Sequence, residues 1–262
     1  MKEEATYLQG LNDAQRGPVL HKDGALMVIA GAGSGKTRVL TYRIAHLMAQ
    51  GVDSFNILAL TFTNKASKEM LERVNELVEQ NIDDLWGGTF HSIGNRILRR
   101  HADELGFERN FSILDRDDQK ALLKQVIKDT KVDTKNKRFP KPDLLLSIFS
   151  LMVNTQETLD DILYHKYDYL IEWDQDSEKI RKGYIKKKLE TNSMDFDDLL
   201  VLLLKLLKQD EDVLELYQRK FKYVLVDEYQ DTNLVQCEIV DLLVGKSRNL
   251  MVVGDDAQSI YS

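Results

Sequence analysis

The stretch Ala30-Gly31-Ala32-Gly33-Ser34-Gly35-Lys36-Thr37 decides the fold of this chain. It lies between an apolar run, Ala25 to Ile29, and a segment of helical periodicity, Val39 to Met48. A strand, a glycine-rich turn and a helix N-terminus in this order predict a phosphate-binding loop. The backbone N–H groups of such a turn surround the phosphates of a nucleotide, and the helix dipole adds partial positive charge at the same point.

Two side chains of the loop have separate predicted roles. Lys36 reaches the β and γ phosphates, and the Thr37 hydroxyl ligates Mg²⁺, because the ion bridges those same phosphate oxygens. The loop departs from the pattern G-x-x-x-x-G-K-[ST] at its first position, where Ala30 stands in place of glycine. This departure affects that turn alone. The alternative interpretation is a flexible glycine-rich loop with a chance lysine.

Composition sets the class of protein but does not identify its partner. The 262 residues are enough for one large or two ordinary domains, with the apolar and charged fractions of a soluble globular protein. No run approaches the roughly twenty apolar residues of a membrane span. The acidic start differs from a signal peptide, so we expect a cytoplasmic protein. One cysteine excludes an internal disulfide, and a net charge of −7 is compatible with a local basic groove for nucleic acid.

Short apolar runs alternate with helical patterns along most of the chain. This alternation predicts an α/β fold with a parallel sheet and helices on both faces. The expected strands are Leu26 to Ile29, Ile57 to Phe62, Gly88 to Phe90, Phe111 to Leu114, Tyr223 to Val226 and Leu250 to Val253. Residues 115–192 break the alternation and are expected to form an all-helical insertion with a polar loop near residues 131–142. The expected parts are therefore 1–114, 115–192 and 193–262.

The second half of the nucleotide site is expected at Val224-Leu225-Val226-Asp227-Glu228. An apolar strand that ends in two carboxylates is typical of a metal-binding acid at the edge of a parallel sheet. Asp227 is expected to hold Mg²⁺, directly or through water, and Glu228 to accept a proton from, or orient, the attacking water. The alternative is that these acids merely cap a following helix.

Two glutamines are weaker candidates for the same site. Gln258 follows another apolar strand and is a neutral amide that can contact a γ phosphate and sense its loss; the alternative is a solvent-exposed turn residue. Gln15 precedes the first strand, and its amide can donate and accept at once, which suits the N6 and N7 edge of adenine. Alternatively, Asn12 or Asp13 simply caps a helix there.

Together these elements resemble the UvrD/Rep-like (UvrD/PcrA) superfamily I DNA helicases, over essentially the whole chain. The motifs that carry the resemblance appear in family order: Leu11-Asn12-x-x-Gln15, Ala30 to Thr37, Thr61-Phe62-Thr63-Asn64-Lys65-Ala66, Gly88-Thr89-Phe90-His91-Ser92, Met194-Asp195-Phe196-Asp197-Asp198-Leu199, Val226-Asp227-Glu228-Tyr229-Gln230-Asp231-Thr232-Asn233 and Gly254-Asp255-Asp256-Ala257-Gln258-Ser259-Ile260-Tyr261. Ala257 departs from the aspartate common before the glutamine.

The resemblance implies a RecA-like P-loop lobe, called 1A, that is interrupted by a helical domain called 1B. It also implies ATP- and Mg²⁺-dependent 3′-to-5′ translocation on single-stranded DNA, unwinding at single/double-strand junctions, and a role in DNA repair. By position, Arg38 lies against the adenine ring and Gln230 joins Gln258 near the γ phosphate. Phe62, His91 and Tyr261 occupy positions where family members contact the DNA strand.

The DNA assignments also have a physical basis. Aromatic faces such as those of Phe62 and Tyr261 stack with any base, and Thr63 and Asn64 supply donors to phosphate. The alternative for Phe62 is a core position at the end of a strand. Two clusters of basic residues, which are either phosphate contacts or solvated faces, are Lys128, Lys131, Lys135, Lys137, Arg138 and Lys141, and Lys179, Arg181, Lys182, Lys186, Lys187 and Lys188.

The sequence stops at Ser262, before the position of a second RecA-like lobe, 2A, in the family. We therefore expect these residues to bind Mg·ATP, hydrolyse it poorly and unwind nothing, because an arginine finger from a second lobe contributes about 10³ to 10⁵ in rate. Alternatives are a helicase subunit of a helicase-nuclease, a non-catalytic ATP- and DNA-binding module, and a small-molecule kinase with the same loop.

Overall fold

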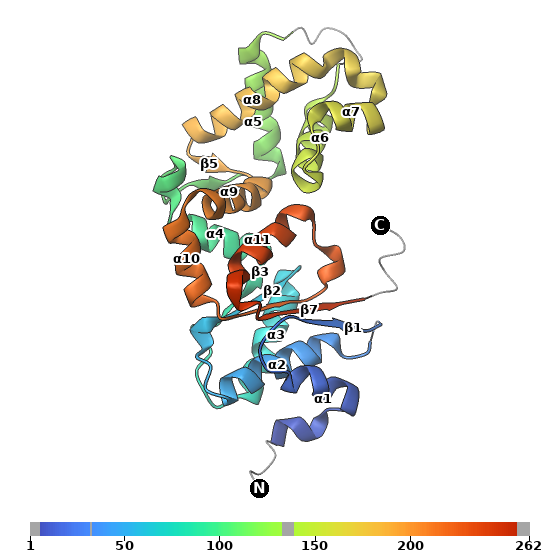
Figure 1. Cartoon of the computed structure of the whole chain (residues 1–262). Helices are drawn as coiled ribbons and strands as arrows, with labels where there is room; N and C mark the ends of the chain where they lie inside the picture. Colours follow the sequence, from blue (N-terminus) through green and yellow to red (C-terminus); the bar gives the residue numbers. More distant parts are fainter. Residues whose placement is uncertain (1–5, 32, 133–138, 256–262) are drawn as a thin grey trace. The chain divides into compact units, whose positions relative to one another are not determined.

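A computed structural model describes residues 6–31, 33–132 and 139–255 of the chain. The chain divides into two compact units (Figure 1). The first unit takes Met1–Ile93, Leu207–Thr232 and Gln236–Ser262, and the second takes Gly94–Leu206 and Asn233–Val235. The predictions for Ala32, Lys135, Lys137, Arg138, Gln258 and Tyr261 lie outside the described residues.

The first unit is built on a parallel sheet of five strands, in the order β1-β7-β6-β2-β3. The strands are β1 (Leu26–Ile29), β2 (Ile57–Thr61), β3 (Trp86–Thr89), β6 (Tyr223–Val226) and β7 (Leu250–Gly254). All four pairings are parallel, so the carboxyl ends of the strands meet at one edge of the sheet. β6 and β7 come from the far end of the sequence yet lie between β1 and β2.

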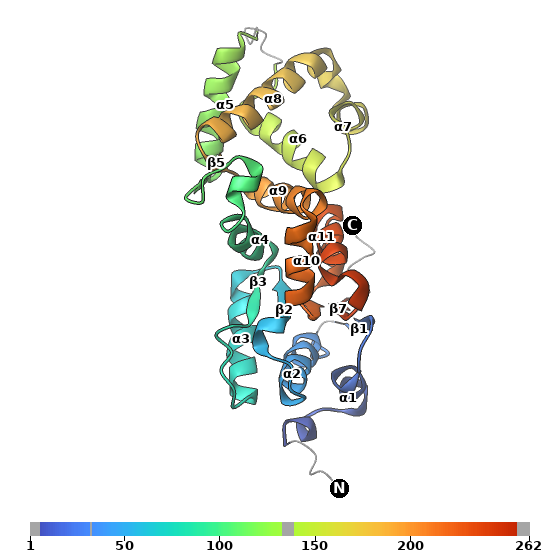
Figure 2. The ribbon, with the colours of Figure 1, turned by 60° about the vertical axis from the view of Figure 1, so that its left-hand side comes forward.

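Helices cover both faces of this sheet, with α1, α2 and α3 on one side and α10 and α11 on the other (Figures 1 and 2). The helical elements of the unit are η1 (Thr6–Gly10), α1 (Asp13–Leu20), α2 (Lys36–Ala49), η2 (Ser54–Asn56), α3 (Asn64–Leu77), α10 (Glu211–Lys220), η5 (Tyr229–Asp231) and η6 (Gly245–Ser247). Three helices run from one unit into the other: α4 (Phe90–Leu98), α9 (Phe196–Gln209) and α11 (Leu234–Val244).

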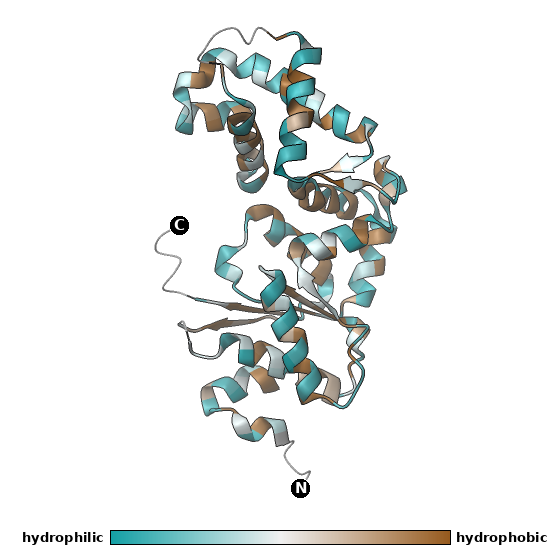
Figure 3. Cartoon of the chain, turned by 180° about the vertical axis from the view of Figure 1, so that it is seen from behind, coloured by the Kyte–Doolittle hydropathy of each residue, from teal (hydrophilic) through white to brown (hydrophobic). Residues whose placement is uncertain are grey.

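Burial along the strands follows their place in the sheet. β2 is buried at all five residues, because both of its faces are covered by helices, and Figure 3 shows the strands as largely hydrophobic ribbons. β1 lies at an edge and alternates: Met27 and Ile29 are 62% and 60% exposed, whereas Leu26 and Val28 pack on the core beneath. That core joins the sheet to buried residues of α2 and α3, including Leu40, Ile44, Met70 and Val74.

Aromatic residues fill the space between β3 and α10. Trp86 is 1% exposed, and its ring centroid lies 5.1 Å from that of Phe221 and 6.1 Å from that of Tyr217. The Lys220 ammonium lies 4.8 Å from the Trp86 ring centroid. Such ring pairs contribute about 0.5–1.5 kcal/mol beyond the area they bury. This cluster fixes the helix that leads directly into β6.

The second unit is mainly helical. It contains η3 (Ala102–Leu105), β4 (Ser112–Ile113), α5 (Arg116–Thr130), α6 (Pro142–Thr155), α7 (Leu159–Lys166), η4 (Asp168–Trp173), α8 (Asp174–Glu190) and β5 (Ser193–Met194). β4 and β5 pair in parallel as a separate small sheet. Buried side chains from α5, α6, α7 and α8, such as Leu123, Leu145, Ile162 and Ile180, form one core.

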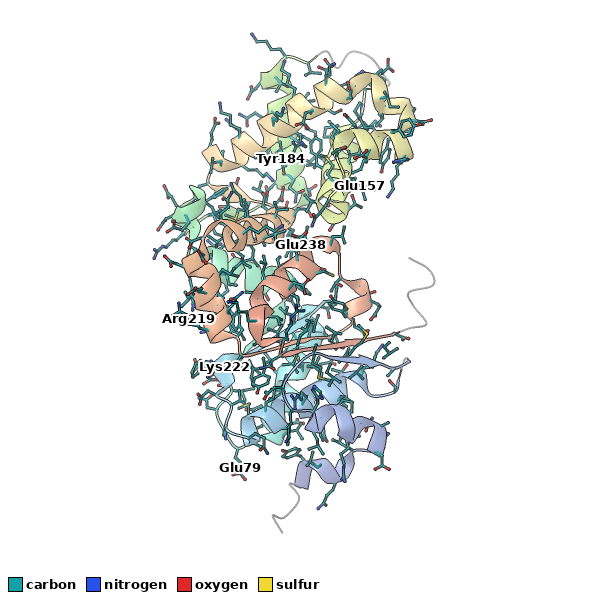
Figure 4. All side chains as sticks on the ribbon, in the orientation of Figure 1. Glu79, Glu157, Tyr184, Arg219, Lys222 and Glu238 are labelled. Carbon is teal, nitrogen blue, oxygen red and sulfur yellow. The ribbon has the colours of Figure 1, made fainter. Side chains whose placement is uncertain are left out.

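A buried ionic cluster closes the start of α9 against α8. The Lys188 ammonium lies 2.6 Å from both Asp195 Oδ2 and Asp198 Oδ2, and the Tyr184 hydroxyl, labelled in Figure 4, donates to Asp195 Oδ2 at 3.1 Å. Asp195 and Asp198 also accept each other's backbone N–H groups at 2.9 Å, which caps α9. Burial and the neighbouring Asp195 raise the pKa of Asp198 to about 6.

The fold confirms an α/β protein with a parallel sheet and helices. β1 and β6 have the expected bounds, but Phe90 begins α4 instead of ending β3. β4 pairs with the unexpected strand β5 and does not join the main sheet. The division at residues 115 and 192 into parts of 1A and an inserted 1B stays a prediction. Among the helices of the described ranges, none combines the length and apolar character needed to cross a membrane.

Candidate functional site

The loop between β1 and α2 has the backbone of a phosphate cradle. Gly33 and Gly35 have φ values of +74° and +87°, a left-handed conformation that side chains with a β-carbon rarely adopt. The N–H of Ser34 donates to Gly31 O at 3.2 Å, which closes the turn, and Gly35 is the N-cap of α2. The unsatisfied N–H groups of the first turn of α2 therefore lie directly after the glycines, where an anion binds best.

The predicted metal ligands converge across 190 residues of sequence. Asp227 directly follows β6, and its N–H donates to Leu60 O of the neighbouring β2 at 2.9 Å. The hydroxyl of Thr37 donates to Asp227 Oδ2 at 3.3 Å. A hydroxyl at the start of α2 and a carboxylate at the end of β6 thus face one point, next to the glycine turn.

Lys36 lies in the same place and is itself buried. Its side chain is 8% exposed, and its ammonium lies 3.3 Å from Glu228 Oε2 and 3.3 Å from Asp255 Oδ2. Gln230 Nε2 donates to the same Glu228 oxygen at 2.8 Å, and Gln230 Oε1 accepts the N–H of Asp255 at 3.0 Å. The lysine, both carboxylates and the glutamine therefore form one connected group.

The electrostatics around Asp227 and Thr37 fit the Mg²⁺ ion of a magnesium-bound triphosphate. Burial and the adjacent Glu228 carboxylate raise the pKa of Asp227, because burial disfavours its ionised form and Glu228 places a like charge beside it. A divalent cation between Asp227 and Thr37 would offset that charge, and one carboxylate plus one hydroxyl is the protein ligand set that this class of site gives to Mg²⁺. Within the described residues no cluster of three His, Cys, Asp or Glu is arranged to hold a metal. The remaining ligands would come from phosphate oxygens and water.

Glu228 has an uncommon backbone conformation. Its φ of +48° lies in the left-handed region, and its side chain is 40% exposed. Such a conformation for a residue with a β-carbon costs about 1–3 kcal/mol and often occurs at functional sites. The chain turns between β6 and η5, so that Asp227 is buried while the partly exposed Glu228 carboxylate contacts the Lys36 ammonium. Neighbouring carboxylates thereby acquire different surroundings.

The candidate nucleotide contacts outside the loop lie beside it. Asn12 caps α1 and forms a reciprocal capping box with Gln15, so the capping alternative describes Asn12 correctly. The Gln15 amide also donates to Ser34 O of the loop at 3.1 Å. Arg38 donates to Gly10 O at 2.8 Å, and its guanidinium lies 5.1 Å from the ring centroid of Tyr42. Adenine recognition by Gln15 and Arg38 stays a prediction.

The predicted DNA residues that the structure describes lie at the carboxyl ends of β2 and β3. Phe62 is half-buried, and its ring centroid lies 5.9 Å from that of Phe90. Thr63 is exposed and caps α3: its hydroxyl accepts the Ala66 N–H at 3.1 Å, and a hydroxyl that accepts still has its own proton to donate. Asn64 is exposed on the first turn of α3, and His91 is half-buried on the first turn of α4. DNA contact by these residues stays a prediction.

Most basic residues of the α8 cluster lie within ion-pair distance of neighbouring acids. Lys182 and Arg181 pair with Glu178, Lys186 and Lys187 pair with Glu190, and Lys188 is buried against Asp195 and Asp198. Lys188 is 5% exposed and therefore does not face a ligand in solvent. For the other basic residues of this helix, phosphate contact and a solvated face both stay predictions.

Asp255 is the residue that the sequence predictions missed. It is 4% exposed and lies as close to Lys36 as Glu228 does. A signal was present, because Asp255 follows the apolar strand β7 just as Asp227 follows β6. The strand pairing brings it into place: the Ala30 N–H donates to Gly254 O at 3.1 Å, which joins the start of the loop to the end of β7.

This fold and this site define a nucleotide-binding protein of the P-loop class, with the loop after β1 and the acids after β6. A family model described as the UvrD/REP helicase N-terminal domain matches residues 11–262. The chain therefore belongs to the UvrD/REP helicase N-terminal domain family.

Curated relatives agree with this assignment. The chain is 46% identical over 257 residues to the ATP-dependent DNA helicase PcrA of Bacillus subtilis (strain 168). It is 45% identical over 255 residues to proteins of the same name from Staphylococcus epidermidis (strain RP62A) and Staphylococcus aureus (strain Mu50). Each match covers 97% of this chain and 34% of the relative, so the chain spans about a third of the length of these relatives.

Proposed function

We propose that this chain is the ATP-binding motor part of a DNA helicase that moves 3′ to 5′ along single-stranded DNA. One observation carries the proposal: Thr37 and Lys36 at the start of α2 meet Asp227 and Glu228 at the end of β6. The similarity to proteins named ATP-dependent DNA helicases supports ATP as the nucleotide and DNA as the partner. A cytoplasmic location and a role in DNA repair belong to the same proposal.

Each residue then has a stated part in ATP hydrolysis. The glycine loop and Lys36 bind the phosphates, and Thr37 and Asp227 hold Mg²⁺, which supplies charge stabilisation at the β and γ phosphates. Glu228 is placed to orient a water or accept its proton, because it is more exposed than Asp227 and adjacent to it. Gln230 fixes the Glu228 carboxylate at 2.8 Å.

The proposed DNA surface of the first unit consists of Phe62, Thr63, Asn64 and His91. Its elements are neighbours, because Thr61 of β2 pairs with Thr89 of β3 and a helix starts directly after each strand. Two helix N-termini side by side favour phosphate oxygens, and the partly exposed ring of Phe62 offers a face for a base. Single-stranded DNA and single/double-strand junctions are the proposed substrates.

We also propose that these 262 residues by themselves bind Mg·ATP but turn it over slowly. Hydrolysis in this class of motor depends on arginines from a second RecA-like lobe, and one such finger contributes about 10³ to 10⁵ in rate. The curated relatives are about three times as long as this chain. Brisk DNA-stimulated hydrolysis by the 262 residues would refute this part of the proposal.

The proposal is tested by nucleotide titration of the chain and two variants. Isothermal calorimetry should show Mg·ATP binding by the wild type, retained binding by Glu228→Gln, and weakening of about tenfold or more by Lys36→Met, since hydrogen bonds to charged groups contribute about 1.5–3 kcal/mol. Residual hydrolysis, followed by phosphate release, should fall in Glu228→Gln. Unchanged affinity in Lys36→Met, or unchanged hydrolysis in Glu228→Gln, would remove the respective residue from its role.

A further inference from the structure

Lys36 and three neighbouring residues, Glu228, Gln230 and Asp255, form a closed ring of interactions. Lys36 contacts the Glu228 carboxylate, Gln230 donates to the same carboxylate oxygen, the Asp255 N–H donates to Gln230, and the Asp255 carboxylate returns to Lys36. Gly254 allows the ring to close, because a β-carbon there would lie 3.0 Å from Gln230 Oε1. The ring joins the start of α2, the segment after β6 and the end of β7.

The ring uses the groups that nucleotide chemistry requires. The Lys36 ammonium is shared between two carboxylates at 3.3 Å each, whereas the proposed function needs it on phosphate oxygens. The Glu228 carboxylate contacts both Lys36 and Gln230 through one oxygen, Oε2. A triphosphate that reaches Lys36 must therefore compete with Asp255 and Glu228 for the same ammonium.

We propose that Asp255 is a positioning residue that holds Lys36 through this ring and competes with the nucleotide phosphates for the Lys36 ammonium. The proposal rests on the function proposed above and adds a regulatory step to the same site. While the ring is closed, the Lys36 ammonium is shared between Glu228 and Asp255. When phosphate takes Lys36, Glu228 and Asp255 both lose their cation partner. Asp255 thus opposes nucleotide binding in the free protein.

The main test is an isosteric change, Asp255→Asn, with Asp53→Asn as a matched control. Asparagine keeps the size of the side chain and its backbone N–H, but removes the charge that attracts Lys36. Asp53 is exposed in the same unit and makes no side-chain cap bond, so its variant removes the same charge away from the site. Affinity for Mg·ATP should rise about threefold to tenfold in Asp255→Asn and stay unchanged in Asp53→Asn, where tenfold corresponds to about 1.4 kcal/mol.

Two double-mutant cycles show whether the effect passes through Lys36. In the Lys36→Met background, Asp255→Asn should leave ATP affinity unchanged, because no ammonium remains to be held. Without any nucleotide, the loss of melting temperature caused by Lys36→Met should be smaller in Asp255→Asn than in the wild type. AMP, which lacks the phosphates that Lys36 reaches, should bind all variants alike.

The outcomes separate failure of the proposed competition for Lys36 from failure of the proposed function. No coupling between Lys36→Met and Asp255→Asn in the nucleotide-free melting experiment would overturn the ring itself. Coupling together with an unchanged or weaker ATP affinity in Asp255→Asn would leave a structural ion pair and overturn the regulatory role. No ATP binding by the wild type would overturn the nucleotide function and the regulatory role with it, whatever the melting experiment shows.

Discussion

Replacement of Gly35 by alanine should destabilise the protein more than the same replacement of Gly51. The two glycines flank α2 and have nearly equal φ values, +87° and +90°. They differ in their surroundings. A β-carbon at Gly35 would lie 2.8 Å from Gln15 Nε2, whereas a β-carbon at Gly51 has nothing within 4 Å. The pair therefore separates backbone strain from the contact with Gln15.

The structure gives the size of each effect. A left-handed conformation costs alanine about 1–2 kcal/mol, and this applies to both variants. In Gly35→Ala, Gln15 must also move off Ser34 O, which it now contacts at 3.1 Å, and a lost hydrogen bond costs about 0.5–1.5 kcal/mol. The expected loss of unfolding free energy is thus about 1–2 kcal/mol for Gly51→Ala and about 1.5–3.5 kcal/mol for Gly35→Ala.

Urea unfolding followed by circular dichroism measures the two losses, and calorimetry measures Mg·ATP affinity. Gly35→Ala should also weaken ATP binding, because the strained position lies inside the phosphate loop, whereas Gly51→Ala should not. In the Gln15→Ala background, Gly35→Ala should cost only the backbone strain of about 1–2 kcal/mol, because the Gln15 hydrogen bond is already absent. Equal losses in the two variants, together with equal ATP affinity, would refute the reasoning about Gln15 and about the loop.

Three further outcomes are expected. Trp86→Ala should lower the unfolding free energy by about 3–5 kcal/mol in urea unfolding, because it removes the central ring of the aromatic cluster beside α10. The control Phe55→Ala, at a side chain 44% exposed, should cost less than about 1 kcal/mol. A loss below about 1 kcal/mol for Trp86→Ala would contradict the packing described. The pKa of Asp198 is about 6 in the folded protein and near 3.9 in the unfolded chain, so ionisation of this carboxyl destabilises the fold. The contribution of Asp198 to the unfolding free energy should therefore decline as pH rises from about 4 to about 6. Unfolding curves across that range should therefore show a decline in the wild type that Asp198→Asn reduces, and identical pH profiles would exclude the assignment. Calorimetry should show that the wild type binds ATP about tenfold more tightly than GTP. Gln15→Ala should abolish this preference, and the control Gln50→Ala, at an exposed residue, should preserve it. Equal affinity of the wild type for both nucleotides would refute adenine recognition by Gln15.

Local signals were sufficient for the strands and turns next to the site. β1 and β6 are short apolar runs bounded by turn or charged residues, and both have the bounds expected from sequence. The pattern of short apolar runs extends the expected strand to Phe90. In the structure, the Thr89 hydroxyl accepts the Ser92 N–H at 3.2 Å, so the helix begins earlier than hydrophobicity suggests. Thr89 is therefore the sequence signal for the start of α4, and the apolar pattern alone does not reveal it.

Contacts distant in sequence were beyond local reasoning. β4 and β5 are only two residues each and pair across about eighty residues, so neither has a period long enough to detect. Lys188 belonged to a run of lysines, and only its approach to Asp195 and Asp198 shows that it is buried. Asp255 reaches Lys36 because β7 pairs with β1, a neighbour that follows from topology and not from the residues beside it.

The strand order also determines when each strand gains its neighbours during synthesis. β1 and β2 are made early but do not touch, since the sheet places β7 and β6 between them. Thr37 leaves the ribosome 190 residues before Asp227 does, which at about 5–20 residues per second is roughly 10–40 s. Throughout that interval β1 lacks β7 and β2 lacks β6, although the other neighbour of β2, the strand β3, is made early. The nascent chain must keep them from aggregating until its last strands emerge.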